Sequence, residues 1–133
     1  MNVSADAQTV EAVVRRYYAA LEAGTPLAPF FDLDGPWQPV VKIGTEAGEF
    51  DVGRAAVAAV LARVSRELQD NRLASRRLCL HVTGDTAWFA DEVWWAGMAG
   101  GAPFAGSTRW SGVLRRRAAQ WRFVLLHVSE PVE

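Results

Sequence analysis

Apolar side chains recur at spacings of three and four residues in the first part of the chain, from about Ala7 to Ala23. This period places them on one face of an amphipathic helix. Gly24 followed by Pro26 is a normal helix stop, because glycine accepts the left-handed conformation and proline cannot continue the helical hydrogen bonds. The predicted apolar stripe consists of Val10, Val13, Val14, Tyr17 and Leu21.

A second amphipathic helix is predicted from about Gly53 to Gln69, and after it the period of the apolar positions changes to that of strands. Four strand candidates rich in Val, Leu, Trp and Phe follow, at residues 72–82, 86–96, 107–117 and 120–129. A short helix at 26–31 and a strand at 40–44 are predicted between the two long helices. Helices first and then a strand meander, without strand-helix-strand alternation, predict an α+β fold with an antiparallel sheet.

The predicted strands have two apolar faces, because alternate side chains of a strand point to opposite sides. In the last strand one face carries Trp121, Phe123, Leu125, His127 and Ser129, and the other carries Arg122, Val124, Leu126 and Val128. Two helices can cover only one face of such a sheet, so we expect a homodimer in which a second copy covers the other. The alternative is an exposed face on which Trp side chains pack against Arg side chains.

The charge of the chain argues against two classes of partner. Fourteen basic and fifteen acidic residues give a net charge of −1 over 133 residues, so nothing favours nucleic-acid or anionic-membrane binding. The length suits one domain, residues 1–133. A single cysteine allows no internal disulfide, and no signal peptide is recognised, so we expect a cytoplasmic protein. Six tryptophans, against roughly two for an average chain of this size, need a structural or binding role.

Several stretches of the sequence resemble one family. The segment 17–24 (YYAALEAG) resembles the first helix of SnoaL-like proteins, which belong to the nuclear transport factor 2-like superfamily. The segment 42–45 (KIGT) with Gly53-Arg54 resembles their strand and helix opening, and 109–114 with 121–129 resembles their final hairpin. The most specific element is Trp121, followed six residues later by His127-Val-Ser129. This ending is similar also to that of the association domain of calcium/calmodulin-dependent kinase II.

The resemblance covers nearly the whole chain and implies a cone, in which a strongly curved antiparallel sheet wraps around the N-terminal helices. It also implies a pocket between sheet and helix, usually in a dimer. The same cone serves isomerases, dehydratases, polyketide cyclases, epoxide hydrolases, transport adaptors and oligomerisation modules, so it does not by itself imply an activity. The chain departs from the family at Thr25, often acidic in relatives, and at Ala118-Ala119, where Asp-Gly is usual.

Three residues are candidates for acid–base catalysis. His127 lies on the aromatic face of the last predicted strand, where an imidazole can act as a general acid or base. Asp91 and Glu92 interrupt an apolar strand, and only one of these two neighbours can face the pocket. As in ketosteroid-isomerase-like relatives, the inward carboxylate would move a proton at a carbon next to a carbonyl. We prefer Glu92, because it shares its face with Trp88 and Trp94.

Each candidate also has a purely structural interpretation. His127 can be a core histidine hydrogen-bonded to Ser129 or to a backbone carbonyl. The inward carboxylate of the pair Asp91 and Glu92 can be neutralised by Arg109, with the other carboxylate at the dimer edge.

The predicted ligand-binding residues are mainly aromatic. Trp37 is expected near the mouth of the pocket, and the glycines of the segment 97–106 form a candidate lid. The two histidines, His81 and His127, lack Cys or carboxylate partners at ligand spacing, so neither a metal site nor a cofactor is predicted. The complete predicted binding set is Tyr17, Tyr18, Phe31, Trp37, Trp88, Trp94, Arg109, Trp110, Phe123 and Leu125.

Two functions remain open at this point. In the first, the cone binds a mainly apolar small molecule, with proton transfer or an isomerase, cyclase or hydrolase step as the chemistry. In the second, the chain is a non-catalytic dimerisation or interaction module, as its similarity to a kinase association domain implies.

Overall fold

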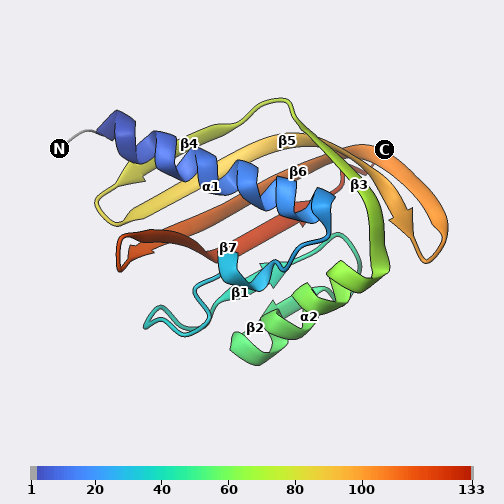
Figure 1. The fold of residues 1–133 in the computed structure, drawn as a ribbon, viewed down its shortest axis with the longest axis horizontal. Coiled ribbons are helices and arrows are strands. Elements are labelled where there is room, and N and C mark those ends of the chain that lie inside the picture. The colour runs from blue at the N-terminus through green and yellow to red at the C-terminus, as the bar shows by residue number, and fades with distance from the viewer. Residues whose placement is uncertain (1–2, 133) are drawn as a thin grey trace.

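Two helices and a seven-stranded sheet form the fold in the computed structural model, which describes residues 3–132 (Figure 1). Helix α1 (Val3–Ala23) lies across the concave side of the sheet, and α2 (Arg54–Glu67) lies beside its short strands. A 3-10 turn, η1 (Ala28–Phe30), stands where a short helix is predicted. Within residues 3–132, no helix has both the length and the apolar character needed to cross a lipid bilayer.

The strands lie in the order β2-β1-β7-β6-β5-β3, with β4 paired to the remaining part of the β5 edge. All neighbouring strands are antiparallel except β1 and β7, which are parallel. The predicted α+β class, with helices first and a strand meander after them, is confirmed. The strand bounds are β1 (Val41–Ile43), β2 (Phe50–Val52), β3 (Leu68–Ser75), β4 (Cys79–Thr83), β5 (Thr86–Ala99), β6 (Ala102–Arg117) and β7 (Gln120–Ser129).

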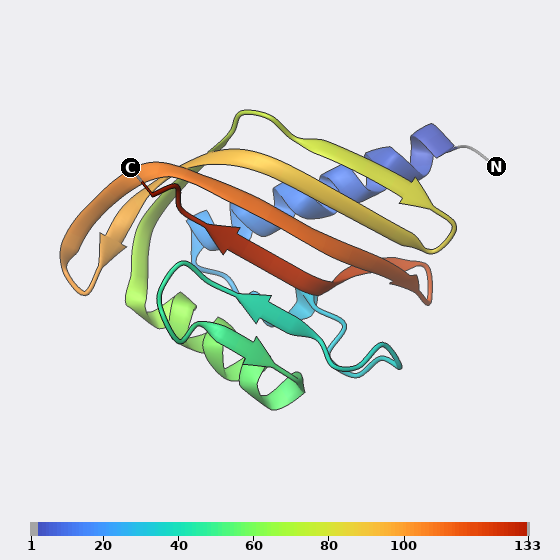
Figure 2. The same ribbon diagram turned by 180° about the vertical axis from the view of Figure 1, so that it is seen from behind.

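The core lies between α1 and the inner face of the sheet. Every residue of the stripe predicted on α1 is buried, as are Tyr18 and Ala20 beside it. Tyr17 packs edge-on against Phe31 and Phe123, with ring centroids 6.1 and 5.3 Å apart. Figure 2 shows the opposite face of the sheet, over which no helix of the described chain lies. The helices therefore cover one face only, as the sequence predicts.

The glycine-rich segment 97–106 is part of the sheet, so the prediction of a loop and lid there is wrong. β5 and β6 continue through it and Ala99 pairs with Ala102, which leaves a two-residue turn at Gly100 and Gly101. Their φ angles are 56° and 83°. A two-residue hairpin turn of this type requires positive φ at both positions, which glycine adopts without steric cost. The glycines thus extend the hairpin instead of opening it.

A β-bulge interrupts the pairing of β6 with β7. Val113 pairs with Leu125, but the next residue, Leu114, pairs with Phe123. Val124 is therefore an extra residue opposite the β6 strand. An extra residue shifts the alternation of side chains by one position for the rest of the strand.

The bulge reverses the faces that strict alternation predicts for the end of β7. Leu126 and Val128 are buried on the inner face, with relative exposures of 0% and 3%. His127 is exposed, and Leu125 and Ser129 alternate with the buried residues on the outer face. The prediction that Leu125 and His127 face the interior is therefore wrong.

The strand predicted at 72–82 is two strands, because the chain leaves the sheet between β3 and β4. Backbone and side-chain oxygens of β5 satisfy the amides of this break: Arg76 N donates to the Glu92 carbonyl (2.8 Å) and Arg77 N donates to Asp91 Oδ1 (3.0 Å). β3 also begins directly after α2, at Leu68. The short strand β2 was not predicted, since three residues carry too little alternation to be recognised.

Candidate functional site

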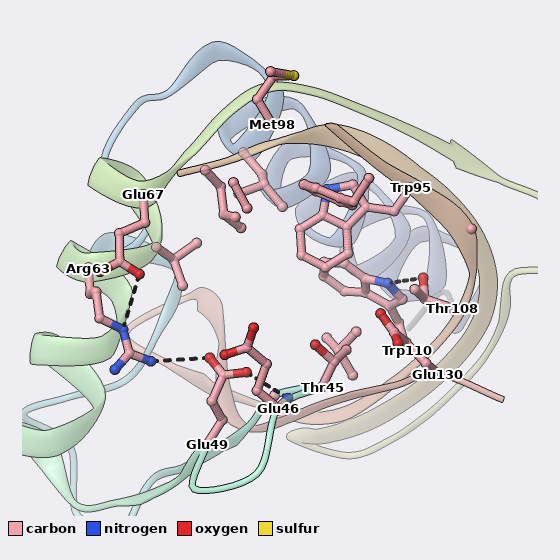
Figure 3. Close-up of a pocket in the computed structure, with 18 of the residues that line it drawn as sticks. Thr45, Glu46, Glu49, Arg63, Glu67, Trp95, Met98, Thr108, Trp110 and Glu130 are labelled. Carbon is pink, nitrogen blue, oxygen red and sulfur yellow. Dashed lines mark hydrogen bonds and ion pairs between the residues drawn. The ribbon is translucent and has the colours of Figure 1, made fainter. Parts of the chain in front are cut away.

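A cavity of about 1070 Å³ opens beside the curved end of the β5–β6 hairpin (Figure 3). The end of α2 and the loop between β1 and β2 form its other side, and β7 closes its inner end. In Figure 3 Trp95 and Trp110 lie on one side, and Arg63, Glu49 and Glu67 lie on the other. The cavity therefore has two chemically different walls.

Four rings in edge-to-face contact form the aromatic wall. The centroid of Trp95 lies 5.4 Å from that of Phe104 and 5.6 Å from that of Trp110. Trp110 in turn contacts Tyr17 on α1, at 6.2 Å. Such contacts place ring edges against ring faces and hold the rings at fixed angles. The wall is a rigid surface for another flat apolar ring.

Hydrogen bonds fix both indoles of this wall. Trp95 Nε1 donates to Asn71 Oδ1 (2.9 Å), and Trp110 Nε1 donates to the hydroxyl of Thr108 (2.8 Å). That hydroxyl donates onward to the Val93 carbonyl (2.7 Å). Because the indole N–H groups are satisfied inside the protein, the rings keep their orientation without a ligand.

The opposite wall is a chain of paired charges. Arg63 on α2 bonds Glu49 Oε2 at 3.1 Å and lies 3.8 Å from Glu67 Oε1. The other carboxylate oxygen of Glu49 accepts the backbone N–H of Glu46 (2.9 Å). These contacts fix the loop between β1 and β2 against α2, at the entrance of the cavity.

Lys42 on β1 also lines the cavity, although its side chain is only 7% exposed. No described residue forms a hydrogen bond or an ion pair with its ammonium group. Burial lowers the pKa of Lys42 more than the nearby carboxylates of Glu49 and Asp51 raise it. Lys42 is therefore a buried cationic group of the cavity without a partner among the described residues.

The hydroxyl of Tyr17 is a second free polar group of the cavity. Its ring is buried in the aromatic wall, and the hydroxyl makes no hydrogen bond to any described residue. Burial raises the pKa of Tyr17, so the hydroxyl stays protonated at neutral pH and can donate to a ligand oxygen.

Of the three predicted catalytic residues, only Asp91 points to the interior, where it is fully engaged. It accepts a hydrogen bond from the Tyr18 hydroxyl (2.9 Å) and one from the Arg77 backbone (3.0 Å). Burial and then the Asp91 charge raise the pKa of Tyr18. Neither Asp91 nor Tyr18 lines the large cavity. The pair fixes α1 to β5 and to the segment between β3 and β4.

The preference for Glu92 as the inward carboxylate is wrong. Glu92 lies on the exposed outer face of β5, directly opposite Arg109 on β6, and His127 lies there opposite Ser111. These residues border a shallow hollow of about 380 Å³ on the outside of the sheet. The structure therefore separates Glu92, Arg109 and His127 from the aromatic cavity by the thickness of the sheet.

The predicted binding tryptophans divide between surface and cavity. Trp88 and Trp94 are 49% and 39% exposed on the outer face, where the guanidinium of Arg76 lies 5.6 Å from the Trp94 ring. Trp37 is 45% exposed on a loop, with the Arg115 guanidinium 3.7 Å from its ring, and it does not line the cavity. The expectation that Trp37 stands at the mouth is therefore wrong.

The remaining predicted residues belong to the core or the cavity. Tyr17 and Trp110 line the cavity, whereas Tyr18, Phe31 and Phe123 are buried beneath it. Sequence reasoning did not assign Trp95, Phe104 or Lys42 to the site. The adjacent pair Trp94-Trp95 did signal that one indole faces inward, and the solitary lysine in a short strand was a signal that went unused.

Within the described part of the chain, no group of three or more His, Cys, Asp or Glu side chains is placed to hold a metal ion.

Comparison with known sequences gives one family match. The model of the SnoaL-like domain matches residues 10–133. No curated protein matches the chain.

Solved structures share the fold at low sequence identity. A proposed dehydratase of the NTF2-like family from Streptomyces avermitilis superposes with a TM-score of 0.86 at 17% identity, over 99% of this chain and 100% of its own. A proposed aromatic ring hydroxylase from Novosphingobium aromaticivorans gives 0.82 at 15% identity, over 100% and 94%. A proposed calcium/calmodulin-dependent protein kinase II association domain from Xanthomonas campestris gives 0.75 at 20% identity, over 93% and 86%. At these identities the likeness concerns the fold.

Proposed function

The chain belongs to the SnoaL-like domain family, as its sequence motifs predict, and from this membership we propose that its cone binds a mainly apolar, ring-containing small molecule. The observation that carries the proposal is the aromatic wall of Trp95, Trp110 and Phe104 along a cavity of about 1070 Å³. Ligand sites in proteins have volumes of roughly 300–1000 Å³ and combine apolar walls with a few polar groups.

The polar groups of the cavity restrict the ligand further. Among the buried side chains of the lining, the Tyr17 hydroxyl and the Lys42 ammonium have no partner in the described chain, and both donate hydrogen bonds. A ligand that fits both walls therefore carries a ring system and at least one oxygen that accepts hydrogen bonds. The proposed dehydratase and ring hydroxylase with the same fold are consistent with oxygen-bearing ring compounds as ligands of such cones.

Filling the cavity is expected to abolish binding. Gly106 lines the cavity, and a β-carbon added there meets nothing within 4 Å, so Gly106→Leu would occupy ligand space without disturbing the backbone. Calorimetric titration with 2-naphthalenemethanol and related ring alcohols should give an affinity at least about tenfold lower for this variant, a loss of about 1.4 kcal/mol. Ala74→Leu is the control, since Ala74 is exposed on β3 and does not line the cavity. Equal affinity in Gly106→Leu and the parent chain would contradict the proposal.

We propose, as a second function of the same chain, that the outer face of the sheet forms a homodimer. The supporting observation is that Trp88 and Trp94 expose about half and two-fifths of their surfaces there, beside the hollow bordered by Glu92 and Arg109. Neither of these two charged side chains has an ion-pair partner in the described chain, so a second copy could supply one. Clustered exposed aromatic residues mark protein interfaces more often than they mark free surface.

Sedimentation velocity tests the dimer. We expect a dimer at micromolar concentration and a monomer when Trp88→Glu and Trp94→Glu are combined, because two carboxylates on each face would be buried without partners. Ala19→Glu is the control, since Ala19 is exposed on α1, which lies on the opposite side of the sheet. A parent chain that sediments only as a monomer would rule out this interface.

A further inference from the structure

Lys42 is the only lysine among the 133 residues. It is buried, and it has no hydrogen-bond or ion-pair partner among the residues that the structure describes. Its register partners are Leu126 on β7 and Asp51 on β2. Leu126 is fully buried and also lines the cavity. A buried ammonium without a partner destabilises a fold, and a leucine or methionine would fill this position at lower cost. The position therefore needs an explanation other than packing.

The amine of Lys42 is reachable from the cavity. Among the described residues, only Arg115 Nε is both shut off from solvent and without a hydrogen bond. No described residue forms a hydrogen bond with Lys42 Nζ, so this atom differs from Arg115 Nε in not being shut off from solvent. Water or a small molecule can therefore reach it. Since the rest of the side chain is buried, that access is through the cavity that Lys42 lines.

The charges around the cavity favour a neutral ligand group over an anion. Its lining contains three basic side chains, Lys42, Arg63 and Arg66, against four acidic ones, Glu46, Glu49, Glu67 and Glu130. Arg63 is already paired with Glu49 and Glu67. A further carboxylate would meet like charge, whereas a neutral carbonyl would not. An amine and a carbonyl held together in an apolar cavity react with each other.

We propose that Lys42 forms an imine with the carbonyl carbon of an aromatic aldehyde or ketone bound against the tryptophan wall. This inference rests on the proposed small-molecule binding. The amine lone pair adds to the carbonyl carbon, and a proton passes from nitrogen to oxygen to give a carbinolamine. Loss of the hydroxyl group with the second amine proton, as water, then leaves the carbon–nitrogen double bond. Neither an oxidant nor a reductant is consumed.

The electrostatics of Lys42 support this chemistry. Imine formation requires the neutral amine, and burial lowers the pKa of Lys42 from its ordinary value of 10.5. The charged groups that act on it are Glu49 and Asp51, which oppose this shift, and Arg63 on α2, which adds to it. On β7, the residue in register with Lys42 is the apolar Leu126, which carries no charge. The neutral amine is therefore present at lower pH than on an exposed lysine.

Reductive trapping tests the proposal, because one lysine gives one assignable product. The protein is incubated with 2-naphthaldehyde and cyanoborohydride at neutral pH, and the labelled peptides are identified by mass spectrometry. The comparison chain combines Lys42→Met with Arg54→Lys, which moves the single lysine to a position that is 67% exposed. We expect Lys42 to be labelled at least about tenfold faster than Lys placed at position 54, since an aldehyde bound in the cavity is held beside the amine at a high effective concentration. The α-amino group serves as an internal rate standard.

The noncovalent analogue 2-naphthalenemethanol separates the two proposals. If the alcohol binds and Lys42 is labelled no faster than the relocated lysine, imine formation is refuted and the binding function stands. If neither the alcohol nor the aldehyde binds, the binding function fails and the imine fails with it. Lys42→Arg replaces Lys42→Met in the comparison chain should the latter not fold.

The stability of Lys42→Met gives a readout that a merely structural lysine would not give. The folded-state pKa is lowered, so the unfolded chain binds more protons between that pKa and 10.5, and stability of the parent rises with pH across this window. We therefore expect Lys42→Met to melt at a higher temperature than the parent at neutral pH, with a difference that shrinks toward pH 10.5. A variant with a lower melting temperature than the parent at neutral pH would show that Lys42 stabilises the fold, and it would contradict the proposal.

Discussion

Leu126→Ala is expected to destabilise the protein by about 2–5 kcal/mol, whereas Leu125→Ala is expected to cost less than about 1 kcal/mol. The two residues have the same chemistry and are adjacent on β7. Leu126 is fully buried on the inner face, and Leu125 is half-buried on the outer face. The bulge at Val124 alone decides which leucine enters the core.

Urea unfolding of the two variants measures this difference, because the midpoint changes while the slope stays constant if only the folded contacts are lost. Equal losses for Leu125→Ala and Leu126→Ala would contradict the assignment of Leu126 to the core and Leu125 to the outer face. A larger loss of stability for Leu125→Ala would indicate that β7 follows strict alternation and that His127 faces the interior.

Gly112→Ala is expected to destabilise the protein by roughly 1–3 kcal/mol or more. A β-carbon at this position would lie 2.5 Å from the Leu125 carbonyl oxygen and 2.9 Å from Phe89 Cε1. The first atom belongs to the backbone of β7 and the second to a fully buried ring, so neither can withdraw cheaply. Gly112 lies next to the bulged pairing, where the two backbones approach closely.

Gly106→Ala is the control for this substitution, since the same strand offers open space at that position. Its φ is not positive, so alanine fits, and reduced flexibility of the unfolded chain should give a gain of up to about 0.4–1 kcal/mol. Thermal unfolding of both variants separates steric conflict from loss of glycine as such. Similar melting temperatures for Gly112→Ala and Gly106→Ala would contradict the close approach.

The helices were predicted well because the period of the apolar residues along a helix directly indicates which of its faces is buried. The α1 stripe has a single period over about three turns, and all five predicted residues are buried. The adjacent pair Trp94 and Trp95 divides between the two faces of the sheet, as the alternation of strand side chains requires. The alternation of side chains along a strand divides the residues between two faces, but it does not indicate which face lies inside the protein. Glu92 and Asp91 were assigned the wrong way for that reason.

The site was less predictable because it depends on pairing between distant strands. The bulge exists only in the register of β7 against β6, and no local pattern in residues 120–129 reveals Val124 as the extra residue. The glycines at 97–106 appeared to be a loop, since a strand pair with a tight turn has the same composition as a flexible segment. Lys42 reaches the cavity only because β1 pairs with β7.

The position of β7 in the sheet also sets the order in which the fold can be completed. β7 is the last strand along the chain, yet it stands between β1 and β6 and is the only link between the β1–β2 pair and the other strands. During synthesis the apolar stripe of α1 and the β1–β2 pair are made long before residues 120–129 emerge from the ribosome. These surfaces remain without their final partner until then, which is when a protein of this topology depends most on protection against aggregation.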